Sequence, residues 1–401
     1  MNCILFDHPE IKETLLPLSF TRPVSKMLVG ILTIEEKWQK YLACESSHLT
    51  DEYLNKKFTA KYENSNLLIN GAVCPTEGLV AAIKKLNDGE VLLKEGILIA
   101  GVFSKEQVVE LWKNKFSVHE NVIEYTDELL VIDVPWKIFS NNANQIEIDF
   151  ELITKGRKSQ PVGDPHTIIY GQENVFIEEG VSIKASIINA EDGPVYIGKN
   201  AELHEGAIVQ GPCAILKSAF VNVGAKIRRA TTIGSYCKVG GEVNNVVFFG
   251  NSNKGHEGFL GNAVVGEWCN FGADTNNSNL KNNYANVKLW SYKNQSFKDT
   301  RLQFCGLIMG DHSKCGINTM FNTGTVVGVS VNLFGPGFPR NFIPSFSWGG
   351  AQGFTTYQLR KVFEVAEKVM ERRKVPFDEI EKDILIHIFE VSAQFRRWEN
   401  S

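Results

Sequence analysis

The segment from Asn251 to Tyr284 holds the residues whose types and spacing are best suited to chemistry. It is rich in glycine and asparagine, and it places His256 between two glycines in the run KGHEG. A neutral imidazole can accept a proton from a reacting group, so His256 is a candidate general base. A simpler interpretation makes His256 a surface or hydrogen-bonding residue of a turn. The asparagines at 276–283 are then a solvated corner loop or an internal ladder, since side-chain amides satisfy backbone groups at turns.

Composition and charge limit the classes of function to consider. A chain of 401 residues predicts two or three domains, and fractions of 43% hydrophobic and 22% charged residues are those of an ordinary globular protein. The net charge of −4 gives no basis for expecting nucleic acid or an anionic membrane as a partner. The first ten residues lack the basic region of a signal peptide, and no apolar run reaches the roughly 18 residues of a transmembrane helix. The eight cysteines include no CxxC pair, which predicts no metal site and favours a reducing cytoplasm.

A six-residue repeat begins at about Thr167. An aliphatic residue occupies its first position and a small residue occupies its fifth through eight consecutive repeats. The aliphatic positions are Ile197, Leu203, Val209, Ile215, Val221, Ile227, Ile233 and Val239. The small positions are Ala201, Ala207, Cys213, Ala219, Ala225, Thr231, Cys237 and Val243. This pattern is typical of a parallel β-helix, in which the aliphatic side chain fills the interior and only a small one fits beside the turn.

The repeat is interrupted and then resumes. Breaks fall at 189–194, 244–256 and 276–311, and we expect them to be loops extruded from coil corners, which often carry function in solenoids. The expected interior positions after the breaks are Phe259, Val265, Phe271, Ile317, Thr323 and Val329.

The flanking regions predict two further parts. Residues 1–152 alternate apolar strands at 3–6, 67–69 and 97–100 with helical stretches at 79–86 and 104–115, which indicates a layered α/β domain. Ser104 and Gln107 form the pattern of a helix-capping box. A polar linker at 153–166 leads to the β-helix at 167–345. Residues 346–401 then form a helical tail, with helices at 355–373 and 376–397.

Part of the first domain resembles the start of the sugar-1-phosphate nucleotidylyltransferases. The segment is LLPLSFTRPVSKMLVG, and the matching residues are Pro17, Leu18, Thr21, Arg22 and Pro23. The family's Gly-rich phosphate loop is replaced by Ile11–Leu15, which contains a glutamate and bulky side chains. The family's lysine after TRP aligns with Val24, and alanine stands at Ala72 where the family has a metal-binding aspartate.

These departures predict a structural or ligand-sensing first domain rather than an active nucleotidylyltransferase. Nucleotidyl transfer depends on positioning the phosphates and on Mg²⁺ to neutralise their charge, so the loss of both loop and carboxylate is severe. Arg22 and Lys26 are the remaining candidates for nucleotide binding. We expect a requirement for Mg²⁺ only if this domain is active.

The second resemblance involves His256. The runs NKGHEGFLG, VGE and GADT, at 253–261, 265–267 and 272–275, resemble the acetyltransferase half of bifunctional N-acetylglucosamine-1-phosphate uridylyltransferases. The resemblance implies that His256 is the base that deprotonates a sugar amine as it attacks acetyl-CoA. It implies substrate or acetyl-CoA contacts for Asn279 and Lys281, a phosphate-side contact for Lys254, and Phe259 in place of the family's tyrosine. It also implies a left-handed β-helix and a homotrimer with the acyl site between neighbouring coils.

The sequence thus favours N-acetyl transfer from acetyl-CoA to an amino-sugar phosphate or a nucleotide sugar. Two alternatives stay open. One is Mg²⁺-dependent nucleotidyl transfer at the first domain, yielding a UDP- or dTDP-sugar. The other is a binding or scaffold protein that has kept the shape and lost both chemistries.

Overall fold

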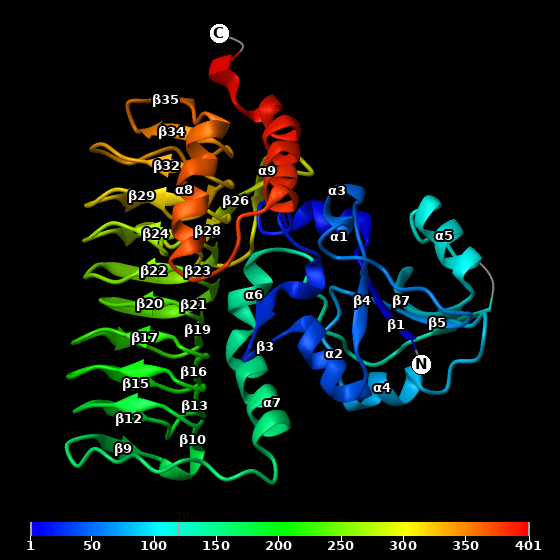
Figure 1. Ribbon diagram of the computed structural model, residues 1–401, viewed down its shortest axis with the longest axis horizontal. Helices are drawn as coiled ribbons and strands as arrows, with labels where there is room; N and C mark the ends of the chain where they lie inside the picture. The colour runs from blue at the N-terminus through cyan, green and yellow to red at the C-terminus, as the bar shows by residue number, and fades with distance from the viewer. Residues whose placement is uncertain (1, 119–120, 400–401) are drawn as a thin grey trace. The chain divides into compact units, whose positions relative to one another are not determined.

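The structure is a computed structural model that describes residues 2–118 and 121–399. The chain forms two compact units, shown in Figure 1. The first unit contains the chain up to residue 27 together with residues 32–134. The second contains residues 28–31 and 135–401. The two units therefore divide at Val134, earlier in the chain than the boundary expected near residue 152.

The first unit is a six-stranded mixed sheet with helices. Its strand order is β4 (Ser46–Leu49), β1 (Asn2–Phe6), β5 (Asn66–Asn70), β7 (Ile97–Phe103), β6 (Val91–Lys94) and β8 (Val122–Glu124). Strand β1 pairs in parallel with β4 and β5, whereas β7 is antiparallel to both of its neighbours. The helices are α1 (Pro9–Thr14), η1 (Val24–Lys26), α2 (Ile34–Leu42), α3 (Glu52–Asn55), α4 (Glu77–Ile83) and α5 (Lys105–Lys113), and a short strand β3 (Leu32–Thr33) precedes α2.

This unit confirms the predicted α/β layers. The three expected strands lie in β1, β5 and β7, and the two expected helices are α4 and α5. The predicted capping box is also present, because the Ser104 hydroxyl accepts from the Gln107 amide while the Gln107 side chain accepts from the Ser104 amide. The strands alternate with helices along the chain, and the central residues of β1, β5 and β7 are almost fully buried.

The helices α6 (Trp136–Ser140) and α7 (Asn142–Thr154) belong to the second unit. The side chain of Asn142 accepts from the Gly30 amide at 2.7 Å and donates to Ala230 O at 2.8 Å, and Asp149 accepts from the Ile31 amide at 2.8 Å. These buried polar contacts hold strand β2 (Leu28–Val29) and α7 with the solenoid coils. Because they join residues far apart in the chain, local patterns do not reveal them, and α7 was expected in the first domain instead.

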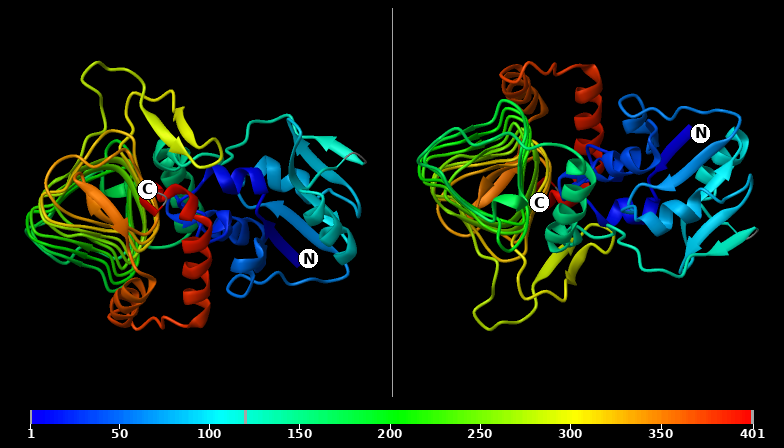
Figure 2. Two further views of the ribbon diagram at one scale, coloured as in Figure 1. Left: turned by 90° about the horizontal axis from the view of Figure 1, so that it is seen from above. Right: turned by 90° about the horizontal axis from the view of Figure 1, so that it is seen from below.

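The rest of the second unit is a parallel β-solenoid, whose triangular cross-section is clear in Figure 2. One of its flats is a ten-stranded sheet: β11 (Ser182–Ile183), β14 (Glu202–Leu203), β17 (Phe220–Val221), β20 (Lys238–Val239), β22 (Asn253–Lys254), β24 (Asn270–Phe271), β29 (Lys314–Cys315), β32 (Asn332–Leu333), β34 (Ser347–Gly350) and β35 (Gly353–Thr356). Only its last pair, β34 and β35, is antiparallel.

The other two flats share long strands. One flat is β10 (Val175–Ile177), β13 (Val195–Ile197), β16 (Cys213–Ile215), β19 (Thr231–Ser235), β21 (Glu242–Gly250), β23 (Phe259–Glu267), β28 (Leu307–Met309), β31 (Thr325–Val327) and β33 (Phe342–Ile343). The other is β9 (Ile168–Tyr170), β12 (Ile187–Asn189), β15 (Ile208–Gln210) and β18 (Lys226–Ile227), continued by β21 and β23 and then by β25 (Asn276–Asn277) with β30 (Met320–Phe321). A short helix, η2 (Gln172–Asn174), separates β9 and β10.

The predicted interior of the solenoid is confirmed between 197 and 243. All eight aliphatic and all eight small positions have at most 1% of their surface exposed. After the break at 244–256 the predicted interior positions are confirmed at Val265 and Phe271 but not at Phe259. Leu260 rather than Phe259 pairs with Val243 and is buried, because the corner within β21 is shorter than the regular repeat. After the long loop the interior residues are Cys315, Phe321 and Val327, whereas Ile317 is 71% exposed.

The second unit ends in elements outside the repeat. The hairpin β26 (Lys288–Ser291) and β27 (Ser296–Asp299) is extruded within the predicted break at 276–311 (Figure 2). The predicted tail helices are confirmed as α8 (Leu359–Glu371) and α9 (Glu379–Val391), followed by η3 (Ala393–Phe395) and η4 (Arg397–Glu399). Among the residues described, no helix is both long and apolar enough to cross a membrane.

Candidate active site

His256 lies at a corner of the solenoid, in the turn that connects β22 to β23. Gly258 in this turn has φ of +117°, and a Cβ on it would lie 2.2 Å from Thr275 O in the next coil. Only glycine therefore allows the turn to stack this closely. The side chain of His256 is exposed and lines a cavity of about 670 Å³.

Lys254 points into the solenoid, contrary to the phosphate-side contact expected for it. Lys254 pairs with Val239 of the buried interior ladder, and only 2% of its surface is exposed. Its ammonium donates to His256 O at 2.8 Å and to Gly240 O at 3.3 Å. Burial lowers the pKa of Lys254 to about 8. Lys254 thus supports the backbone of the corner that carries His256, and it does not line the cavity.

The cavity floor is the outer face of the ten-stranded sheet. Lys238, Asn253, Asn270 and Lys314 occupy successive rungs of this face in register. Oδ1 of Asn253 is buried and has no hydrogen-bond partner in the described part of the chain, so a ligand donor has an acceptor here. The C-terminal end of α8 forms the opposite wall with Val369 and, just beyond it, Arg372 and Arg373.

The electrostatic character of this cavity is uniformly positive. Its charged lining residues are Lys238, Lys314, Arg372 and Arg373, and no aspartate or glutamate lines it. Within residues 2–118 and 121–399, none of these four cations forms a salt bridge. Their contacts are neutral: Lys238 Nζ lies 5.0 Å from the centre of the Phe220 ring, Lys314 donates to His312 O at 3.0 Å, and Arg373 donates to Tyr236 O at 2.8 Å.

Burial lowers the pKa of Lys314 to about 8, so it still carries a proton at neutral pH. A pocket with several cations and no carboxylate attracts anions, and arginine and lysine together suit phosphate oxygens. His256 therefore lies beside a site with the chemistry to hold a phosphorylated ligand.

The other predicted contact residues are not on this cavity. Phe259 and Asn279 lie together over Gly261, where a Cβ would be 2.5 Å from Phe259 Cζ and 2.8 Å from Asn279 Nδ2. Asn279 also donates to Asn262 Oδ1 at 2.7 Å. Lys281 lines a different cavity and donates to Asn286 O at 2.7 Å. Phe259 and Asn279 therefore lie close to each other, and neither lines the His256 cavity.

Four cavity residues were missed from the sequence. Lys238 and Lys314 immediately precede the interior residues Val239 and Cys315, so their outward position could have been deduced from the repeat once its phase was known. Arg372 and Arg373 follow a helix about a hundred residues after the histidine, and nothing local links them to it.

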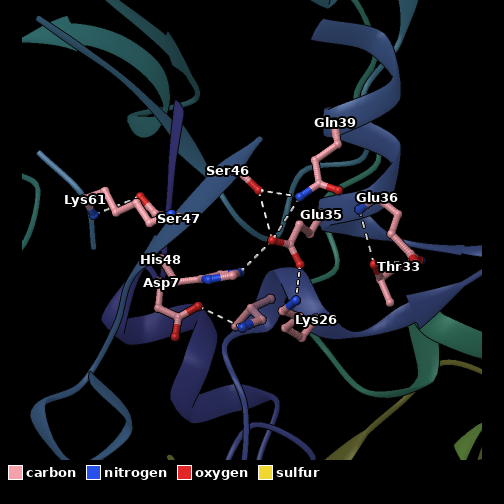
Figure 3. Close-up of polar contacts among 11 residues, drawn as sticks. Asp7, Lys26, Thr33, Glu35, Glu36, Gln39, Ser46, Ser47, His48 and Lys61 are labelled. Atoms are coloured by element: carbon pink, nitrogen blue, oxygen red, sulfur yellow. Dashed lines mark hydrogen bonds and ion pairs between the residues drawn. The ribbon is translucent and has the colours of Figure 1, made fainter. Parts of the chain in front are cut away.

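The first unit places Lys26, one of the two nucleotide-binding candidates, in a network of internal polar contacts (Figure 3). Lys26 pairs with Glu35, which also accepts from Ser46 Oγ at 2.9 Å and lies 3.2 Å from His48 Nε2. Burial alone would raise the pKa of Glu35, but the hydrogen bonds from His48 and Lys26 outweigh it and lower the pKa to about 2. Arg22 is itself 6% exposed.

Helix α1 occupies the place of the family's phosphate loop, as the replacement at Ile11–Leu15 predicts. Its Lys12 is buried and lies 3.2 Å from Asp7 and 2.8 Å from Asp51, and it donates to Thr50 Oγ1 at 2.8 Å. These contacts neutralise a lysine that could otherwise meet a phosphate.

The neighbourhood of Ala72 does not suit Mg²⁺. The only polar side chain beside it in sequence, Asn70, is buried, donates to Leu98 O at 3.0 Å and accepts from the Ala72 amide at 3.0 Å. Its amide group is thereby committed to the backbone, and Mg²⁺ sites usually require a carboxylate. Over the described residues, no group of three or more His, Cys, Asp or Glu side chains is arranged to hold a metal ion.

Comparison with known proteins finds similarity to sugar nucleotidyl transferases and to bifunctional nucleotidylyltransferase/acetyltransferases. Residues 3–158 match the model of a sugar nucleotidyl transferase family. The chain is 25% identical over 274 residues to the bifunctional sugar-1-phosphate nucleotidylyltransferase/acetyltransferase of Sulfurisphaera tokodaii, covering 67% of this chain and 61% of that relative. It is 34% identical over 156 residues to the bifunctional protein GlmU of Methanocaldococcus jannaschii, covering 38% and 35% of the two chains.

These matches confirm the resemblance predicted from the sequence, at low identity. The chain spans less than two thirds of the length of either relative. Among solved structures, Arabidopsis UDP-N-acetylglucosamine acyltransferase is similar with a TM-score of 0.25 and 15% identity, over 52% of this chain and 78% of that one. A likeness of that size does not bear on function.

Proposed function

We propose that this protein is an acyl-CoA-dependent N-acetyltransferase that acts on an amino-sugar phosphate or a nucleotide sugar, with His256 as general base. The observation that carries the proposal is the position of His256. Its exposed side chain shares a cavity with four cations and no carboxylate. The acetyltransferase named among the relatives supports the same reaction class.

The chemistry asks for little beyond positioning and one proton acceptor. The amine nitrogen of the acceptor forms a bond to the thioester carbonyl carbon, the carbon–sulfur bond breaks, and CoA leaves as the thiol. A neutral His256 takes the proton that the amine loses as it attacks and can return it to the leaving sulfur. Holding amine and thioester in one geometry supplies most of the remaining acceleration.

The cations define the acceptor. Lys238, Arg372 and Arg373 would hold a phosphate or diphosphate while the sugar amine faces His256. An amino sugar without a phosphate would lose these contacts and bind weakly. Acetyl-CoA is the proposed donor, and the protein is proposed to act as a homotrimer, as the family resemblance implies. A cytoplasmic location is proposed from the cysteine usage.

Nucleotidyl transfer at the first unit is the alternative, and the family match over residues 3–158 favours it. The internal pairing of Lys12 and Lys26 and the commitment of Asn70 to backbone groups weigh against it. A protein that has lost both chemistries would bind ligands at the same cations without turnover.

The test measures two products from the same preparation. Release of free thiol from acetyl-CoA is followed with a panel of amino-sugar phosphates, nucleotide sugars and unphosphorylated amino sugars. Release of pyrophosphate is followed with nucleoside triphosphates, sugar 1-phosphates and Mg²⁺. We expect thiol release with a phosphorylated amino sugar and no pyrophosphate. Pyrophosphate release without thiol release would replace the proposal by the alternative.

A further inference from the structure

A second and larger cavity lies at the far end of the same unit. Its volume is about 1370 Å³, and it is separate from the His256 cavity. The extruded hairpin β26–β27, the coil at 340–344, the β34–β35 hairpin and the chain end at 394–398 contribute its lining. The hairpin lies in a break of the repeat and the chain end lies beyond it, so both are additions to the solenoid rather than part of its core.

Aromatic rings line this cavity. Trp290 stacks on Phe342 with ring centres 4.3 Å apart and planes 11° apart, and Phe297 packs its edge against Trp290 at 5.4 Å. Phe297 keeps 45% of its surface exposed. Phe354 and Trp398 form a second aromatic pair, with ring centres 5.8 Å apart. Exposed ring faces and edges of this kind are the usual partners of nucleobases.

Positive charge accompanies the aromatic rings. The charged lining residues are Lys281, Lys288, Arg340 and Arg397, and no aspartate or glutamate lines the cavity. None of the four makes a salt bridge in the part of the chain that the structure describes, and Lys281 donates to a backbone carbonyl, Asn286 O, at 2.7 Å. Asn322, Thr323 and Gln352 add neutral hydrogen-bonding groups. Unneutralised guanidinium and ammonium groups suit phosphate oxygens.

We propose that this second cavity binds a nucleotide, with the base against the aromatic rings and the phosphates on the cations. Neither feature alone identifies the ligand: the cations would accept any phosphate and the rings any flat apolar group. Their combination in a cavity larger than most small-molecule pockets fits a base joined to a diphosphate. Two sources share this chemistry, namely the nucleotide part of CoA and a nucleoside diphosphate or its sugar. The site stands whether or not His256 is catalytic.

The experiment is calorimetric titration of the full-length protein with UDP, dTDP, ADP, desulfo-CoA and inorganic pyrophosphate. Two variants test the two features separately: Lys288→Gln combined with Arg340→Gln removes charge, and Phe297→Ala removes an exposed ring. Lys298→Gln is the matched control, because Lys298 neighbours Phe297 on the same exposed strand but does not line the cavity.

We expect at least one nucleotide to bind, at least tenfold more weakly in both test variants and unchanged in the control, and to bind more tightly than pyrophosphate. Tighter binding of desulfo-CoA than of UDP and dTDP would identify the acyl donor as the source, and the reverse order a nucleotide sugar. The proposal is overturned if no nucleotide binds, if neither test variant weakens binding, or if pyrophosphate binds as tightly as the nucleotides.

Discussion

The polar cluster of the first unit and the His256 cavity of the second both contain lysines. Carboxylates pair with the lysines of the cluster but not with those of the cavity. In the first unit Lys12 pairs with Asp7 and Asp51. Lys26 pairs with Glu35, as Figure 3 shows. On the solenoid, Lys238 contacts a ring, Lys314 and Arg373 contact backbone carbonyls, and no carboxylate lines the cavity that they share with Arg372.

The difference distinguishes cations that stabilise the fold from cations that are open to a ligand. An unpaired buried charge is costly to desolvate, so buried charges are paired. In the first unit Lys12 and Lys26 therefore contribute to stability through their ion pairs. Cations at an open cavity keep water as their partner until an anion replaces it. The match to a sugar nucleotidyl transferase family lies at residues 3–158, whereas the cations that no carboxylate neutralises line the His256 cavity on the solenoid.

The largest effect on stability is expected from Glu35→Gln. Removing the carboxylate costs about 2 kcal/mol, because the buried His48 loses its charged partner, while Lys26, whose side chain is 36% exposed, regains water in part. The loss is measured as the free energy of opening of β1 by native-state hydrogen exchange, with Glu45→Gln, which changes an exposed glutamate, as control. An unchanged opening free energy would mean that the cluster is not holding the first unit together.

The same glutamate predicts a dependence on pH. Its pKa is lowered from 4.5 to about 2, so its contribution is complete above the unfolded value and is lost as pH falls towards the folded one. The wild type should therefore lose stability between about pH 5 and pH 2 by more than Glu35→Gln does. Parallel curves for the two proteins would contradict this assignment.

Arg372→Gln combined with Arg373→Gln should produce a smaller effect, on binding. We expect KM for the phosphorylated acceptor to rise by about tenfold to a hundredfold while kcat changes little, because charge-assisted hydrogen bonds to phosphate are lost in substrate and transition state alike. Arg360→Gln changes an exposed arginine of α8 that pairs with Glu364 and does not line the cavity, and it should leave KM unchanged. An equal rise in KM for the unphosphorylated amino sugar would show that the arginines do not recognise phosphate.

The smallest effect concerns Lys254. Its folded pKa of about 8 lies below the unfolded value of 10.5, so between these values the unfolded chain holds a proton that the folded chain has released. Stability should therefore rise with pH in this window, by about 1–2 kcal/mol from pH 7.5 to 9.5. Lys254→Met should lack this part of the rise, and Lys217→Met, at an exposed position, should keep it. An identical rise in both variants would mean that Lys254 is not buried as a cation.

The sequence predicted what depends on neighbours along the chain. The residues from Ile197 to Val243 could be assigned to the solenoid interior because each position has the same surroundings in every coil. The capping box at Ser104 is equally local. His256 could be singled out because its segment resembles a known one.

Long-range stacking was not predictable in this way. Lys254 enters the interior because a corner one coil earlier is short, and that shift appears only when the coils are stacked. Arg372 and Arg373 line the His256 cavity because of where the tail runs, which the sequence does not show. Lys281 lines the other cavity because of where the extruded loop runs. The stacking of the coils also decides that Cys315 lies in the interior, whereas Ile317, which was predicted to be interior, is 71% exposed.

The most direct test of the account is acetyl-CoA turnover by His256→Ala beside wild type, with the acceptor that gives the fastest thiol release. His166→Gln, which changes an exposed histidine off the cavity, is the control. We expect kcat to fall by about a hundredfold to ten-thousandfold in His256→Ala, since a general base supplies that much, and to stay unchanged in the control. Equal turnover by His256→Ala and wild type would contradict the claim that the solenoid corner holds the catalytic base.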